Sequence, residues 1–195
     1  MYTRLMVVVA MVVVAGAAEG REREGSFGRS VTVCMGTPVA AANPARAVTS
    51  EIFARIGVRV DWRRADNCPA DGIAIQFRMA TDYALLPGAL AYALPFEGVH
   101  ICIFWDRVHS FGTAMEVGML SHVLAHEIGH ILEGFPRHAE EGVMKAEWNK
   151  EDRDHIVHHQ ALAFSMADAD LIHRGLAAKA ARGAAIDATR TIFRD

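Results

Sequence analysis

The segment "TAMEVGMLSHVLAHEIGHILEG", residues 113–134, constrains the fold more than any other stretch of the chain. Its apolar residues recur at intervals of three and four, which predicts one long amphipathic helix with a stripe that must be buried against another layer. The stripe consists of Leu120, Val123, Leu124, Ile128, Ile131 and Leu132. Because "HEIGH" lies within this segment, any site that its histidines build stands on a packed helix.

Short apolar runs before this helix predict the sheet on which it packs. They are "VTVCMG" at 31–36, "VRVDW" at 58–62, "GIAIQFRM" at 72–79 and "VHICIFWDRV" at 99–108. A helical pattern at 43–57 separates the first two runs, which predicts parallel strands joined by a helical crossover. The run at 99–108 is apolar on both faces, so we expect it inside the sheet. The fold class expected from this order is α/β, with α+β as the broader description.

The part of the chain after Phe135 is expected to form a loop followed by helices. Two helical patterns, "KEDRDHIVHHQAL" at 150–162 and "SMADADLIHRGLAAKAA" at 165–181, are separated by a short break. Ser165 is a favourable N-cap for the second helix, with Asp168 three residues further on.

The first 18 residues have the pattern of a secretory signal peptide. Arg4 precedes an apolar run from Leu5 to Ala15, and small residues follow at a suitable cleavage position. The run is shorter than the roughly 20 residues that a membrane-spanning helix needs, although an uncleaved anchor is the alternative. We expect residues 19–195 to be exported and to form a single domain. The net charge of −3, without long charged runs, gives no sign of nucleic-acid or membrane-surface binding.

The three cysteines are Cys34, Cys68 and Cys102. Export would place them in an oxidising compartment, where one disulfide and one remaining thiol are expected. Their spacing does not fit a zinc cluster, and the sequence alone does not determine the pair. Cys34 with Cys68 is favoured, because Cys102 lies in an apolar run and can be a buried thiol.

The spacing of "HEIGH" is the spacing that a helix needs to bind one metal ion. His126 and His130 are one turn apart on the same helix face, so both can direct a ring nitrogen at the same ion. Glu127 is turned about 100° around the axis, toward a water on the metal rather than the metal itself. Zinc lowers the pKa of such a water toward roughly 7, and a carboxylate can take its proton during attack on a carbonyl carbon.

A catalytic zinc site of this kind needs a third protein ligand, for which we predict His138. Gly134 can take the left-handed conformation that ends the helix and returns the chain toward the metal. Glu133 lies about 10 Å along the axis from His126, so we interpret it as a solvated helix end. His122, one turn before His126, is interpreted as a core or supporting histidine.

Other residues remain open as metal ligands. Three carboxylates compete with His138 for the third position: Glu140, Glu141 and Glu147. A second group of histidines can bind metal opportunistically but is interpreted as a polar helix face: His155, His158 and His159.

At these residues the chain resembles the metzincin clan of zinc metallopeptidases, which has the motif HExxHxxGxxH and then a turn containing a methionine. Gly134 and His138 stand for the glycine and the third histidine, and "EGVM" puts Met144 in the methionine turn. Here the glycine comes one residue late and the histidine two. The longer pattern at 125–148 resembles a subgroup of bacterial secreted proteins with HExxHxxxGxxxH, although Ala139 replaces the serine usual after the histidine.

The resemblance implies a metzincin-like fold. Its parts are a twisted mixed sheet with an antiparallel edge strand, an active-site helix, and a small, mostly helical C-terminal part. Residues 19–134 and 135–195 would be the two parts of one catalytic domain. In that clan the edge strand, which we expect around 90–94, binds extended peptide by backbone pairing. Met144 would form a hydrophobic floor under the ligands, with Trp148 packed beneath the turn.

The expected function is therefore that of a secreted or periplasmic bacterial zinc metalloendopeptidase. One Zn²⁺ would be held by His126, His130 and His138, with Glu127 as general base and acid. The expected partner is a peptide or protein substrate, and we expect a monomer with no nucleic acid and no stable membrane association. The alternatives are a zinc-dependent amidase of the cell envelope, a non-hydrolytic zinc-binding protein, or a plain amphipathic helix that binds no metal.

Overall fold

The computed structural model describes residues 29–82 and 84–192. The predicted signal peptide, residues 1–18, lies outside the described residues. None of the helices in the described ranges is both long enough and apolar enough to span a membrane.

The described residues contain a five-stranded mixed sheet in the order β2-β1-β3-β5-β4. The strands are β1 (Arg29–Met35), β2 (Val58–Arg63), β3 (Ile73–Arg78), β4 (Ala91–Ala93) and β5 (His100–Phe104). β1, β2, β3 and β5 pair in parallel, whereas β4 pairs antiparallel with β5 and forms one edge. This confirms the predicted fold class, the parallel first pair and the antiparallel edge strand.

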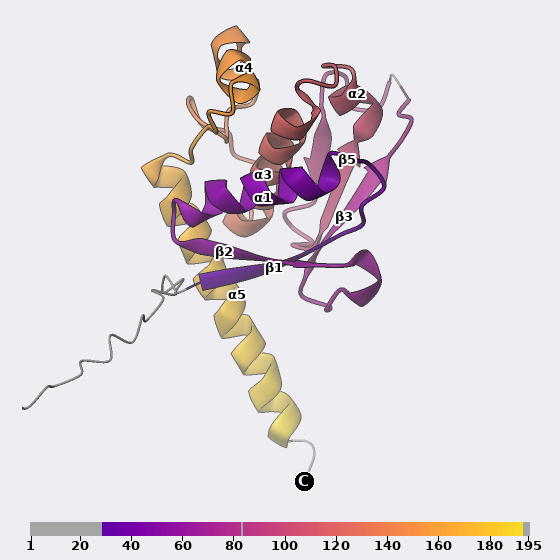
Figure 1. Cartoon of the computed structure of the whole chain (residues 1–195). Helices are drawn as coiled ribbons and strands as arrows, with labels where there is room; N and C mark the ends of the chain where they lie inside the picture. The colour runs from indigo at the N-terminus through magenta and orange to yellow at the C-terminus, as the bar shows by residue number, and fades with distance from the viewer. Residues whose placement is uncertain (1–28, 83, 193–195) are drawn as a thin grey trace, which may run out of the picture.

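The helices pack on the sheet and on one another (Figure 1). They are α1 (Ala42–Ala54), α2 (Trp105–His109), α3 (Glu116–Glu133), α4 (Lys150–Val157) and α5 (Met166–Ile192), with a 3-10 turn at Ala65–Asn67. α1 connects β1 to β2 and lies against α3, and α5 packs along α3 before it extends away from the body of the molecule (Figure 1).

The core lies between α1, α3 and the sheet. Every residue of the predicted apolar stripe on α3 is buried, which confirms the helix and its orientation. The hydroxyl of Thr49 on α1 donates to the carbonyl oxygen of Ser121 on α3 at 3.1 Å. The two helices are thus joined by a buried polar contact as well as by apolar packing.

Two predicted boundaries are wrong. The expected strand at 99–108 ends at Phe104, and Trp105 begins α2. A short apolar run has the same composition in a buried strand and a buried helix, and here Asp106 fixes the helix by accepting hydrogen bonds from the backbone and side chain of Thr81. The expected helix at 150–162 ends at Val157, and His159 has a positive φ of 58° that cannot continue it.

The disulfide joins Cys34 to Cys68, the pair that the sequence favoured. It ties the end of β1 to the segment that follows the 3-10 turn. Cys102, on β5, is a free thiol and is buried, as its apolar run predicted.

Candidate metal centre

Three histidines converge at one end of α3. His126 and His130 come from the helix and His138 from the loop that follows it. One ligand nitrogen from each ring lies within 4.8 Å of those of the other two. The ring centroids are 4.5 Å apart for His126 and His130, 5.4 Å for His126 and His138, and 5.0 Å for His130 and His138. The structure therefore brings together all three residues that the sequence predicts as metal ligands.

The loop that carries His138 is shaped by the end of the helix. Gly134 has a φ of 83°, in the left-handed region, and its N–H donates to the carbonyl oxygen of His130 at 3.0 Å. This is the conformation predicted for Gly134, and it turns the chain back. Beyond His138, the N–H of Ala139 donates to the carbonyl oxygen of Met144 at 2.7 Å, which closes the returning loop.

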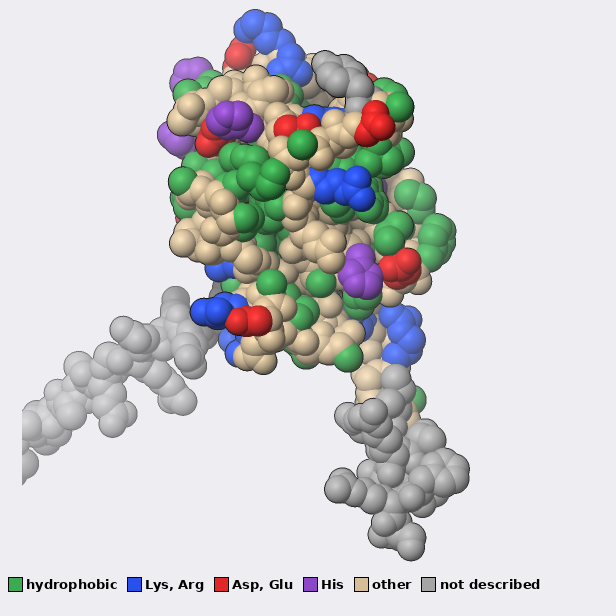
Figure 2. All heavy atoms as spheres, turned by 90° about the vertical axis from the view of Figure 1, so that its right-hand side faces the viewer, with side chains coloured by type: hydrophobic (Ala, Val, Ile, Leu, Met, Phe, Trp, Pro, Cys, Tyr) green, Lys and Arg blue, Asp and Glu red, His purple; other side chains and the backbone are tan. Residues whose placement is uncertain are grey.

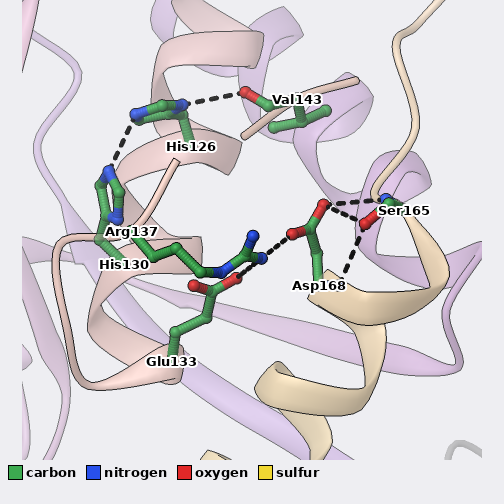
Figure 3. A network of polar contacts seen from close by, with 7 residues as sticks. All are labelled: His126, His130, Glu133, Arg137, Val143, Ser165 and Asp168. Carbon is green, nitrogen blue, oxygen red and sulfur yellow. Dashed lines mark hydrogen bonds and ion pairs between the residues drawn. The ribbon is translucent and has the colours of Figure 1, made fainter. Parts of the chain in front are cut away.

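The hydrogen bond of His126 determines which of its nitrogens is free. Its Nδ1 lies 2.9 Å from the carbonyl oxygen of Val143, so Nδ1 carries the proton and donates it (Figure 3). Its Nε2 then faces the Nε2 of His130 at 3.0 Å (Figure 3). Two nitrogens of a tetrahedral zinc site lie about 3.3 Å apart, given zinc–nitrogen bonds of about 2.0 Å. The spacing of the pair suits a shared ion.

The protonation states of the buried groups also suit a metal. Burial lowers the pKa of His126 to about 4 and that of His130 to about 3. Both rings are therefore neutral near pH 7, which is the form that binds metal. Glu127 is buried beside them, and burial raises the pKa of its carboxyl to about 8. A nearby cation would favour the charged carboxylate.

Three imidazoles form a donor set typical of catalytic zinc. Because His138 is exposed, the centre is accessible to solvent from its side. The other proposed ligands lie outside this centre: among the described residues, only the three histidines form a group with metal-ligand spacing. The six residues that remained open as alternative metal ligands are all exposed: Glu140, Glu141, Glu147, His155, His158 and His159.

His122 is a buried supporting residue, as predicted. Its Nδ1 donates to the carbonyl oxygen of Gly118 at 2.7 Å, and its Nε2 accepts from the N–H of Leu162 at 3.0 Å. The neighbouring carbonyl oxygen of Ala163 accepts from the N–H of Val143 at 3.0 Å. Since Val143 also fixes His126, His122 helps to hold the segment on which that ligand depends.

Met144, expected in a methionine turn, lies directly against α3 between His126 and His130. Met144 is fully buried, and a Cβ built on Gly129 would meet its Sδ at 2.6 Å. Gly129 therefore allows this close approach, a role that its position in the sequence does not reveal without Met144. The sequence signal for this role is a glycine in the interior of a helix. At such a position glycine lowers the stability of the helix by about 0.5–1 kcal/mol relative to alanine. Trp148 lies edge-on to His122 and His126, with ring centroids 5.9 and 6.0 Å away.

The interpretation of Glu133 as a solvated helix end is wrong. Its side chain is fully buried, because Arg137 folds back over it and α5 covers the end of α3 (Figure 3). Burial raises the pKa of this carboxyl to about 7. Arg137 also forms an ion pair with Asp168, which caps α5 together with Ser165 as predicted. Arg137 was missed because its partner is thirty-one residues away in the chain.

The mixed sheet and its histidine-bearing helix form a metzincin-like fold, and comparison with solved structures supports this fold. The chain is similar to archaemetzincin from Methanopyrus kandleri, with 14% sequence identity and a TM-score of 0.53. The match covers 76% of this chain and 94% of archaemetzincin. Neither family models nor curated proteins give a match to the sequence. The chain thus has a metzincin-like fold, which here combines a five-stranded mixed sheet with a histidine-bearing helix.

Proposed function

We propose that the protein is a zinc-dependent metallopeptidase. The observation that carries this proposal is the convergence of His126, His130 and His138, with the buried Glu127 next to His126 on the same helix. The similarity in fold to archaemetzincin supports the proposal, because the HExxH segment independently resembles the same clan. Bound zinc would lower the pKa of a water molecule and polarise the substrate carbonyl.

Each residue of the site would have its own role in zinc binding or in proton transfer. His126, held by Val143, and His130 would present their Nε2 atoms to zinc, and His138 would complete the set from the loop. Glu127 would accept a proton from the attacking water and return it to the leaving amine. The surrounding burial keeps this carboxyl away from bulk solvent, which favours transfer to the substrate.

The edge strand β4 offers a surface for extended peptide. The backbone N–H and C=O groups of Leu90, Tyr92 and Leu94 point toward β5. The carbonyl oxygen of Leu90 accepts from the N–H of Phe104 at 2.9 Å, and the N–H of Leu94 donates to the carbonyl oxygen of His100 at 3.0 Å. In this antiparallel register the backbone groups of the alternate residues 91 and 93 point away from β5, toward the open edge. β4 also lies against α3. We propose that residues 91 and 93 pair with the substrate backbone.

Apolar side chains are exposed beside this edge. Leu94 is 37% exposed and Phe96, in the turn after β4, is 85% exposed. Figure 2 shows the side of the molecule on which α2 and β5 lie in Figure 1, where hydrophobic side chains reach the surface among charged and histidine side chains. We propose that the substrate is an unstructured peptide segment with apolar side chains.

We also propose that the protein acts outside the cytoplasm. The signal-like segment at 1–18 and the disulfide between Cys34 and Cys68 both support export, since structural disulfides persist in oxidising compartments.

The decisive variant is Glu127→Gln, which keeps the shape of the side chain and removes the base. Wild-type protein loaded with one zinc equivalent should cleave casein, and the variant should bind the same amount of zinc but lose at least about 100-fold in rate. Cell-wall fragments assayed in parallel distinguish peptide bonds from other amides. Equal activity of wild type and variant on casein and on a broad peptide library would refute the peptidase proposal.

A further inference from the structure

The third histidine is held less directly than the other two. His126 and His130 stand on a buried helix, and His126 has a hydrogen bond from its second nitrogen. The side chain of His138, in contrast, makes no hydrogen bond to any described residue, and it is exposed. Its position therefore depends on the loop to which it belongs.

That loop is anchored on both sides of His138. On the C-terminal side, the N–H of Ala139 donates to Met144 at 2.7 Å. On the N-terminal side, the anchor is the side chain of Arg137, which reaches into the protein and lies between two carboxylates (Figure 3). Its Nη2 pairs with Asp168 and lies 3.5 Å from Oε1 of Glu133.

Asp168 is held in place by hydrogen bonds with Ser165 in addition to its ion pair with Arg137. One of its oxygens, Oδ2, accepts from the N–H and the hydroxyl of Ser165 at 2.9 and 2.8 Å, so the other is left for the guanidinium (Figure 3). Its side chain is fully buried, and the backbone of α5 lies directly on α3 at Gly175. The first turn of α5 is thus a rigid support for the residue next to the metal ligand.

We propose that Arg137, held by Asp168, is a positioning residue that places His138 in the metal centre. This inference rests on the proposed function, because it requires that the three histidines bind zinc. The ion pair links the docking of α5 to the geometry of a ligand that comes from another part of the chain. Residues that orient metal ligands typically change metal affinity by about 10–100-fold when they are replaced.

The test compares Arg137→Met and Asp168→Asn with wild type. Zn²⁺ affinity is measured by competition with a chelating dye, at a temperature where each metal-free protein is folded. Both variants should bind zinc about 10–100-fold more weakly. The double variant should be no weaker than the weaker single variant, because the two residues act as one unit. Arg137→Lys, which keeps the charge, should recover part of the affinity.

The matched control is His173→Ala, on the same helix. The Nε2 of His173 donates to the carbonyl oxygen of Ile56 at 2.7 Å, so its loss weakens the docking of α5 without touching the loop. This variant should unfold at a lower temperature but bind zinc within about twofold of wild type. A second readout is the visible spectrum of the Co²⁺-substituted protein, which reports the ligand set. Arg137→Met should resemble His138→Ala, and His173→Ala should resemble wild type.

The possible failures are distinguishable. If wild-type protein binds no zinc, the proposed function and this inference both fail. If wild type binds zinc and His138→Ala weakens it, but Arg137→Met and Asp168→Asn keep wild-type affinity and Co²⁺ spectra, only this inference is refuted. It is also refuted if His173→Ala weakens zinc binding as much as they do.

Discussion

At the scale of single residues, the buried carboxyls near the candidate metal centre have different partners. Asp168 accepts hydrogen bonds from Ser165 and pairs with Arg137. Neither oxygen of Glu133 has a hydrogen bond within the described chain, and only the 3.5 Å contact with Arg137 offsets its charge. An ionised Glu133 is therefore poorly stabilised, which explains why burial raises its pKa.

The replacement Glu133→Gln tests this on the metal-free protein. Burial raises the pKa of Glu133 from 4.5 to about 7, so the unfolded chain releases this proton before the folded chain does. The folded state consequently loses stability as the pH rises through this interval. The variant should match wild type near pH 4.5 and be more stable at pH 8, by on the order of 1 kcal/mol, in urea unfolding. A wild type that is more stable at pH 8 would mean that the ion pair with Arg137 dominates.

The positions of site residues could be predicted from the sequence where they depend on the geometry of a short stretch of chain. Helical spacing aligns His126 with His130, and the glycine stop at Gly134 brings His138 within reach of both. The burial of Glu133 could not be predicted in this way, because it depends on α5, which begins more than thirty residues later. The role of Gly129 likewise could not be predicted, because it depends on the packing of Met144 against it in the folded chain.

At the scale of elements, α3 is the centre of the molecule, and its contacts with α1, β4 and α5 fix the site. Its boundaries follow from a strong apolar period, which is why they were predictable. The end of β5 was not predictable, since Trp105 and Val108 suit a buried strand as well as a buried helix, and Asp106 between them makes a tertiary contact with Thr81. Antiparallel β4 is only three residues long, and it lies within the edge strand expected around 90–94.

Two glycines on α5 should respond in opposite ways to alanine. A Cβ on Gly175 would lie 1.6 Å from the carbonyl oxygen of Leu132, so Gly175→Ala must separate α5 from α3. We expect a loss of about 1–3 kcal/mol or more in the free energy of unfolding. A Cβ on Gly183 meets no atom within 4 Å, so Gly183→Ala should gain up to about 1 kcal/mol from helix propensity. Equal effects of the two changes in thermal unfolding would contradict the close packing of the helices.

At the scale of the whole molecule, the candidate metal centre joins parts of the chain that are distant in sequence. The three histidines come from α3 and its following loop, Met144 packs against α3 at Gly129, and His122 and α5 hold the surrounding segments. Zinc that binds only the folded arrangement would therefore stabilise the entire domain, since the unfolded chain does not hold the three histidines together.

Removal of metal should accordingly lower the unfolding temperature. At free zinc a thousandfold above its dissociation constant, the stabilisation is about 4 kcal/mol, which a chelator should abolish. Glu127→Gln should keep the zinc-dependent shift, and His126→Ala should lose most of it. Identical unfolding curves with zinc and with chelator would show that the histidine cluster does not bind the metal in the folded protein.

The identity of the third ligand is decided by a crystal structure of the zinc-loaded protein, with the ion located by anomalous scattering at the zinc edge. We predict one ion about 2.0–2.1 Å from Nε2 of His126, Nε2 of His130 and a ring nitrogen of His138, with an open position beside Glu127. An ion that leaves His138 beyond bonding distance, or that takes a carboxylate such as Glu140 in its place, would contradict the proposed centre.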